Sequence, residues 1–275
     1  MVTFLEARTW GLSGNLLESA RARDKEADPT MKKIERPEES FHDPEFLESL
    51  EGRTLRILSE YLSPMTRLDK ARINSTILFL GSAKADPTNA DSAFYRYYWE
   101  AEELAYLLAK WAIGLKTPKG KDFVVCTGAG PGIMEAANRG AMRAGGKTIG
   151  MNISLPQPQN PNAYITPELS FSFYYFFMRK FWLTYKAKAV IAFPGGYGTL
   201  DEFFEIVTLL QTSKISKREM VLVLYGGDYW RDLIQFHSMV EKGAICAEDL
   251  DLFRIVSTPR QAFAYLKKRL SASLG

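Results

Sequence analysis

The sequence predicts a doubly wound α/β fold, in which a mostly parallel sheet carries helices on both faces. Three observations predict it: short apolar runs alternate with amphipathic stretches, each run has the length of a strand, and several runs end in glycine-rich turns. Apolar strands that alternate with helices are typical of a parallel sheet covered on both faces. The predicted strands are 76–80, 123–126, 148–151, 189–193, 220–224 and 253–256.

The predicted helices lie between and after these strands, and an extension precedes them. Residues 1–43 are rich in charged side chains and are interrupted by Pro29 and Pro37, which predicts a mobile or surface-wrapping segment. A helical pattern then runs from residue 44 to about residue 62. We therefore expect a partly helical N-terminal extension over residues 1–69 and a Rossmann-like domain over residues 70–275. The predicted helices of that domain are 91–112, 132–144, 175–187, 199–212, 229–241 and 259–271.

The composition excludes several classes of protein. The 275 residues include 35 Lys+Arg and 32 Asp+Glu, and the net charge of +3 predicts neither a nucleic-acid partner nor a membrane surface. Two cysteines cannot form a disulfide framework and fit a reduced compartment. The N-terminus lacks the pattern of a signal peptide, and the apolar runs are far shorter than the ~20 residues of a membrane helix. We therefore expect a cytoplasmic protein.

Three strand ends carry glycine-rich turns, at residues 80–83, 127–135 and 193–202. Ligands of such sheets bind at the carboxyl ends of strands, where glycines let backbone N–H groups approach an anion. Glycine turns also occur for purely structural reasons, but three at one sheet edge favour a phosphate-bearing ligand. We expect Ser82 in the first turn and Gly130 in the second to contact it.

Two familiar phosphate-binding motifs are absent from these turns. Residues 128–132 do not match G-x-G-x-x-G, because the third glycine comes one residue early, and no acidic residue lies between positions 147 and 167. NAD binding is therefore disfavoured. Residues 140–148 are one residue too long for a P-loop and precede a strand instead of following one.

The third turn has two interpretations. The third turn contains three glycines whose backbone N–H groups a ligand can approach: Gly195, Gly196 and Gly198. Thr199 could cap the next helix, and Glu202 follows three residues later. Thr-x-x-Glu is a capping box, in which Glu202 would only satisfy backbone donors. Alternatively, an ionised carboxylate in the first helical turn lies beside the anion site and suits activation of water or stabilisation of positive charge.

Two further segments could contribute to a site. An aromatic run at 171–177 precedes Arg179 and Lys180. It either packs in the core or offers stacking surfaces beside an arginine that is suited to phosphate or carboxylate. The proline-rich loop 155–168 could cover the site or be a plain surface loop. His42 and His237 have no neighbours at metal-ligand spacing, so we assign neither to a metal.

Together these residues resemble the LONELY GUY (LOG) family, once labelled "possible lysine decarboxylases", and its longer bacterial members in particular. Residues 194–202 (PGGYGTLDE) match the family's P-G-G-x-G-T-x-x-E signature. Residues 128–140 resemble its second glycine turn, and Arg179-Lys180 its Arg-Lys pair. The resemblance implies a Rossmann-like phosphoribohydrolase. Such an enzyme cuts the N-glycosidic bond of a nucleoside 5′-monophosphate, such as AMP or a cytokinin riboside monophosphate, and releases free base and ribose 5-phosphate.

The resemblance also implies roles for particular residues. It implies that Arg179 and Glu202 are catalytic, that no metal or organic cofactor is needed, and that the protein forms a dimer or an assembly of dimers. Met178 directly precedes Arg179, whereas short plant-type members have two residues between them, so cytokinin specificity stays open. The alternative is a non-catalytic nucleotide-binding or cofactor-carrier protein, which would not need both Arg179 and Glu202. The implied nucleotide contacts are Lys180, Gly195, Gly196, Tyr197, Gly198, Thr199, Asp201 and Thr208.

Overall fold

Seven short strands pair into one parallel sheet in the computed structural model, which describes residues 36–115, 123–157, 160–217 and 219–272. The strand order is β4-β3-β2-β1-β5-β6-β7, and every neighbouring pair is parallel. The chain builds outward from β1 to one edge and then from β5 to the other, so the order reverses between β1 and β5. Ligands of open α/β sheets bind at such a reversal point. The strands are β1 (Thr76–Leu80), β2 (Val124–Thr127), β3 (Thr148–Ile153), β4 (Ser170–Phe173), β5 (Ala187–Ala192), β6 (Val221–Tyr225) and β7 (Phe253–Val256).

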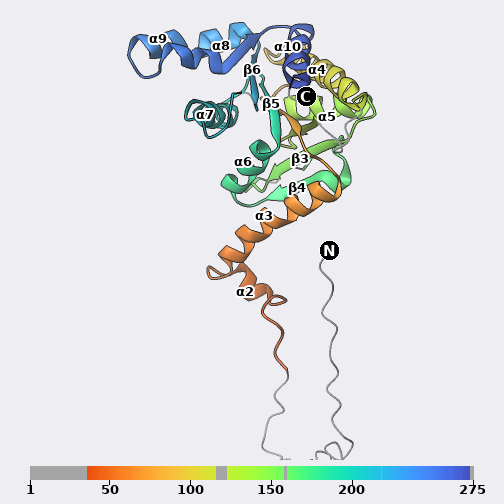
Figure 1. Ribbon diagram of the computed structural model, residues 1–275. Helices are drawn as coiled ribbons and strands as arrows, with labels where there is room; N and C mark the ends of the chain where they lie inside the picture. The colour runs from red at the N-terminus through yellow and green to blue at the C-terminus, as the bar shows by residue number, and fades with distance from the viewer. Residues whose placement is uncertain (1–35, 116–122, 158–159, 218, 273–275) are drawn as a thin grey trace, which may run out of the picture. The chain divides into compact units, whose positions relative to one another are not determined.

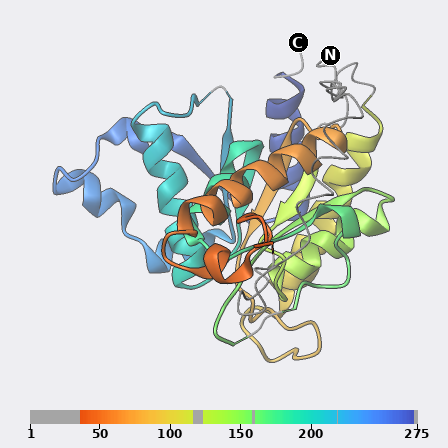
Figure 2. The same ribbon diagram turned by 90° about the horizontal axis from the view of Figure 1, so that it is seen from below.

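Helices cover both faces of the sheet (Figure 1, Figure 2). Alternate residues of β1 enter two separate cores, with Leu78 and Leu80 in one and Ile77 and Phe79 in the other. The first core is closed by α3 (Arg53–Lys70), α6 (Phe176–Tyr185) and α7 (Tyr197–Gln211), and the second by α4 (Tyr95–Ile113), α5 (Ile133–Arg143) and α10 (Pro259–Ser271). The remaining elements are α2 (Pro44–Glu48), α8 (Gly227–Leu233), α9 (Phe236–Glu241) and the 3-10 helices η1 (Pro167–Leu169) and η2 (Ala247–Leu252).

The doubly wound α/β fold predicted from the sequence is confirmed, and all six predicted strands are present. A seventh strand, β4, was not predicted, because its residues were assigned to an aromatic run before a helix. Phe171 and Phe173 are buried, whereas Ser170 and Ser172, which alternate with them, are more exposed. This alternation is typical of an edge strand with one covered face.

The helical pattern predicted from residue 44 to residue 62 is wrong in two details. It is broken after α2, where Ser49 has an extended backbone (ψ 172°), and α3 begins after Gly52. Helix α3 then continues through Pro64 to Lys70. Proline lacks the N–H that would bond to the carbonyl four residues earlier, but Trp182 Nε1 donates to that carbonyl of Glu60 at 3.0 Å.

The predicted helix over 229–241 is also two helices, α8 and α9. Ile234 between them has extended backbone angles, φ −130° and ψ 118°. In the described part of the chain, no helix is both long and apolar enough to cross a membrane.

Residues from Gly52 onward group into one compact unit, and residues up to Glu51 group separately. In the described part of the group that ends at Glu51, Asp43 caps α2 by accepting a hydrogen bond from Phe46 N at 3.1 Å. The division into an extension (1–69) and a Rossmann-like domain (70–275) made from the sequence stays a prediction. Residues 1–35 lie outside the described residues.

Candidate functional site

The three glycine-rich turns meet at one edge of the sheet, as predicted, and two of them follow β1 and β5, between which the strand order reverses. Ser82 N donates to Pro194 O at 3.0 Å, and Ser82 O accepts from Ile133 N at 3.1 Å. A Cβ at Gly132 would collide with Ser82 O, and one at Gly195 would lie 2.9 Å from Ser82 N. Glycine at these two positions therefore lets the second and third turns close around the first.

The third turn leads directly into α7, which begins at Tyr197 with Gly196 as its N-cap. The first backbone hydrogen bond of the helix runs from Leu200 N to Gly196 O (3.0 Å), so the N–H groups of residues 197–199 have no acceptor inside the helix. A Cβ at Gly196 or Gly198 would meet no atom within 4 Å. The end of α7 is therefore open to an anion the size of a phosphate.

The capping-box interpretation of Thr199 and Glu202 is wrong. Because α7 begins at Tyr197, Thr199 is already inside the helix, and the first turn contains no acidic residue. The placement of Glu202 in the first helical turn, on which the alternative was based, is therefore wrong as well. Glu202 lies in the second turn, where its Oε1 accepts a hydrogen bond from Arg179 Nη1 at 3.0 Å. The carboxylate is therefore paired with the arginine that the family resemblance singled out.

Arg179 and Glu202 form the inner ion pair of the site. Both side chains are largely buried, with 11% and 15% of their surfaces exposed. Arg179 Nε also donates to Met151 O, within β3 (2.8 Å). A Cβ at Gly128 would collide with Arg179 Nη2. The second glycine turn is thus shaped around the guanidinium.

Burial dominates the electrostatics of the inner ion pair. It raises the pKa of Glu202 above its ordinary value, and the attraction of Arg179 opposes this shift without cancelling it. Burial also raises the pKa of the neighbouring Cys126 thiol to about 12, so that thiol stays protonated at neutral pH. A carboxylate held in so dry a place interacts strongly with any charge that develops beside it.

A second group of charges, the outer cluster of Lys180, Asp201 and Glu205, joins the same two helices. Lys180 Nζ lies 3.2 Å from Asp201 Oδ1 and 3.1 Å from Glu205 Oε2. Burial lowers the pKa of Lys180, but the hydrogen bonds and charges of Glu205 and Asp201 outweigh it and leave the pKa above its ordinary value. Side-chain exposure is 23% for Lys180, 57% for Asp201 and 35% for Glu205, so water reaches this cluster more freely than the inner pair.

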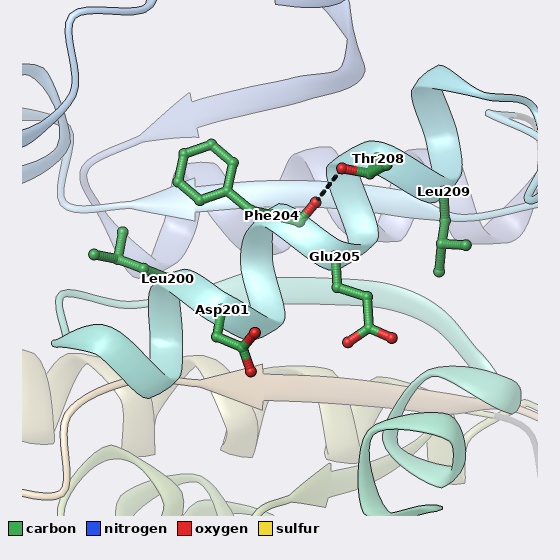
Figure 3. A pocket seen from close by; sticks show the side chains of 6 residues that line it. All are labelled: Leu200, Asp201, Phe204, Glu205, Thr208 and Leu209. Atoms are coloured by element: carbon green, nitrogen blue, oxygen red, sulfur yellow. Dashed lines mark hydrogen bonds between the residues drawn. The ribbon is translucent and has the colours of Figure 1, made fainter. Parts of the chain in front are cut away.

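The predicted contacts Asp201 and Thr208 lie on the outer side of α7. Figure 3 shows them along one face of the helix, with the carboxylates of Asp201 and Glu205 pointing to the same side. This face forms a shallow pocket, and Thr208 Oγ1 donates to Phe204 O at 2.8 Å (Figure 3). Glu202 does not line this pocket. The structure therefore separates the predicted contacts into the inner end of α7 and its outer face.

The loop 155–168 is held against the second glycine turn by Asn162, which the sequence did not reveal. Asn162 Nδ2 donates to Ala129 O (3.0 Å) and to Gly130 O (3.1 Å), and Asn162 N donates to Ala129 O (2.9 Å). Ala129 has a left-handed backbone (φ 69°) that a non-glycine residue rarely adopts. The described part of the loop around Asn162 is thus a fixed wall, and residues 158–159 lie outside the described residues.

Over the described ranges, no group of three or more His, Cys, Asp or Glu side chains gathers in a way that could hold a metal ion. Neither His42 nor His237 therefore belongs to such a cluster.

Comparison with known proteins shows that the region of this site is similar to a known family. A family model described as "Possible lysine decarboxylase" matches residues 134–266, which include the inner ion pair and the third glycine turn. The chain is similar to that family over this region, which is slightly less than half of its length. The matched family is the LOG family, which the sequence motifs resemble. The match begins after α3, β1 and β2.

A curated relative is the pyrimidine/purine nucleotide 5′-monophosphate nucleosidase of Escherichia coli (strain K12). It is 29% identical over an alignment of 133 positions that covers 42% of this chain and 28% of the relative. The matched region therefore spans little more than a quarter of the relative's length. Among solved structures, the Moco carrier protein from Chlamydomonas reinhardtii is 22% identical, with a TM-score of 0.48, over 72% of this chain and 99% of that protein.

Proposed function

We propose that the protein is a phosphoribohydrolase. It hydrolyses the N-glycosidic bond of a nucleoside 5′-monophosphate, AMP or a cytokinin riboside monophosphate, to free base and ribose 5-phosphate. The observation that carries this proposal is the buried Arg179–Glu202 pair beside the open N-terminus of α7. The similarity of residues 134–266 to the family and the likeness to a bacterial nucleotide nucleosidase support it.

In this proposal the phosphate binds at the start of α7. The N–H groups of residues 197–199 and the positive end of the helix dipole suit a dianion. Ser82, Gly130, Gly195 and Gly196 complete the contact surface at the three turns. Holding this non-reacting group fixes the ribose, so binding energy is used to orient the bond that breaks.

Glu202 acts on the sugar carbon of the glycosidic bond. Cleavage builds positive charge on that carbon, and a nearby carboxylate stabilises it and orients the attacking water. The water oxygen forms a bond to the carbon, the bond to the base nitrogen breaks, and the base leaves with a proton. Arg179 keeps Glu202 in place and adds hydrogen-bond donors for sugar or phosphate oxygens. These steps use only side chains and backbone of this chain.

We also propose that the protein works as a homo-oligomer, a dimer or an assembly of dimers. Phe177, Phe181 and Tyr185 are substantially exposed and recur every fourth residue, so they form one aromatic stripe along α6. Light scattering of the purified protein tests this. The cytoplasmic location expected from the sequence stays a prediction, as does the absence of nucleic-acid and membrane partners.

The test is to incubate the protein with AMP, GMP, CMP and isopentenyladenosine monophosphate and to separate the products by chromatography. Release of free base together with ribose 5-phosphate supports the enzyme. Binding of a nucleotide by calorimetry without release supports the alternative, a non-catalytic carrier. No binding and no release of any of the four contradicts both functions.

A further inference from the structure

Helix α3 holds both ends of α6, the helix that carries Arg179. At the start of α6, the Glu60 carboxylate accepts hydrogen bonds from Tyr174 N (2.7 Å) and Tyr175 N (3.3 Å). At its end, Lys186 Nζ donates to Asp69 Oδ1 at 3.0 Å. Residues 60 and 69 are about 14 Å apart along a helix, close to the length of α6 at about 1.5 Å per residue. The two carboxylates of α3 are therefore spaced to match α6.

The start of α6 has no cap of its own. Its N-cap residue is Tyr175, whose side chain makes no capping hydrogen bond. The N–H groups at a helix start need acceptors from outside the helix, and a negative charge there is favoured by the helix dipole. Glu60 supplies both from a distant part of the chain. A local Ser, Thr, Asn or Asp would serve this purpose in many helices.

The main chain of Glu60 makes a second contact with the same helix. Pro64 cannot donate to Glu60 O, because it has no N–H, and this carbonyl instead accepts from Trp182 Nε1 at 3.0 Å. Trp182 is buried, and Tyr61 packs against both Trp182 and Phe181. The residue that caps α6 is thus itself fixed on α6 by a hydrogen bond and by aromatic packing.

A short chain of hydrogen bonds joins Glu60 to the inner ion pair. Glu60 holds Tyr175 N, Tyr175 O accepts from Arg179 N (3.1 Å), and Arg179 Nη1 donates to Glu202. We propose that Glu60 is a positioning residue for Arg179, acting through the first turn of α6 without touching the substrate. Glu60 precedes the residues matched by the family model. The activity measurement below rests on the proposed function, but the exchange measurement does not.

The test compares Glu60→Ala, Glu60→Gln and Asp69→Asn in the full chain. Asp69→Asn is the matched control, because it removes a carboxylate of α3 from the other end of α6. With AMP as substrate, we expect Glu60→Ala to lower kcat about tenfold with KM within about twofold, because the guanidinium is displaced. Glu60→Gln keeps an acceptor oxygen and should restore most of the rate. Asp69→Asn should stay within about twofold of the wild type.

Hydrogen exchange measured by mass spectrometry supplies the second readout. Glu60→Ala should speed exchange in peptides that cover residues 174–179 and leave peptides of α7 unchanged. Equal kcat for Glu60→Ala and Asp69→Asn, or unchanged exchange at 174–179, would overturn the proposal. If Glu60→Ala does not fold, Glu60→Asp decides by the same exchange measurement, because its carboxylate is one methylene shorter: faster exchange at 174–179 supports the proposal, and unchanged exchange overturns it. If the wild type releases no base from any nucleotide, the proposed function fails, and exchange alone decides the role of Glu60.

Discussion

Two sets of charged side chains join α6 to α7, and they differ mainly in their access to water. Arg179 and Glu202 form the inner ion pair, which is largely buried, with Arg179 against the second glycine turn at Gly128. Lys180, Asp201 and Glu205 form the outer cluster, which is more exposed: Lys180 follows Arg179 on α6, and Asp201 and Glu205 lie on either side of Glu202 in the sequence of α7. Exposed ion pairs contribute little, whereas buried charges interact strongly with their surroundings. Adjacent residues on the same two helices can therefore have a chemical role on one side and only a modest structural role on the other.

The largest expected effect is at Glu202. We expect Glu202→Gln to lower kcat for nucleotide hydrolysis about a hundredfold or more, which is the usual scale for a positioned acid–base group. Gln still accepts a hydrogen bond from Arg179, so circular dichroism and thermal unfolding should stay close to those of the wild type. Near-normal turnover of this folded variant would remove Glu202 from the mechanism.

A smaller effect is expected when Gly128, which lies against Arg179 in the second glycine turn, is replaced. Gly128→Ala places a Cβ against Arg179 Nη2 and should lower kcat about tenfold by displacing the guanidinium. Gly114→Ala is the matched control, because Gly114 lies at the end of α4 with φ −73° and its Cβ would be 3.3 Å from Trp111 O. Steady-state kinetics of the two variants should therefore differ. Equal kcat values would mean that the second turn does not position Arg179.

The pH dependence distinguishes the buried carboxylate from an exposed one. Glu202 must be ionised to stabilise positive charge, and burial raises its pKa above 4.5. As the pH falls through this raised pKa, kcat/KM should fall about tenfold per pH unit, and it should recover as the pH rises. Circular dichroism at each pH checks that the protein stays folded. Inhibition by ribose 5-phosphate, measured over the same pH range, shows how ionisation of the phosphate group itself affects binding. An acid limb with its midpoint at or below 4.5 would contradict the burial argument.

The smallest effect is expected in the outer cluster. Glu205→Gln removes one of two carboxylates beside the partly exposed Lys180, so it should change the free energy of unfolding by less than about 1 kcal/mol. The rate of hydrolysis should stay within about twofold of the wild type. Urea unfolding and the same kinetic assay check this, and a loss of rate comparable to that of Glu202→Gln would end the distinction between the two sets.

The sequence predicted what depends on local pattern. The six strands followed from apolar runs, and the meeting of the glycine turns followed from the rule that parallel strands end at one edge. β4 was not predicted, because its two serines and two phenylalanines resemble the aromatic run that follows them. The role of Glu202 was left open, because Thr-x-x-Glu is also a capping pattern, and the start of α7 at Tyr197 excludes the capping box.

Contacts between distant segments could not be predicted from one sequence. Nothing in the local pattern indicates that Glu60 caps a helix 114 residues later. Nor does it indicate that Trp182 donates to the Glu60 carbonyl, which Pro64 cannot bond. Asn162 likewise appears as one polar residue in a proline-rich loop, although it holds the turn at Ala129 and Gly130. Such contacts depend on the packing of whole elements, which periodicity does not encode.

The most direct test of the account is a crystal structure of the Glu202→Gln protein with bound AMP. The account predicts the 5′-phosphate on the N–H groups of residues 197–199 and the glycosidic carbon of the ribose facing the side chain at position 202. A phosphate bound elsewhere, such as against Lys180 and Thr208 on the outer face of α7, would contradict it. So would a ribose turned away from position 202.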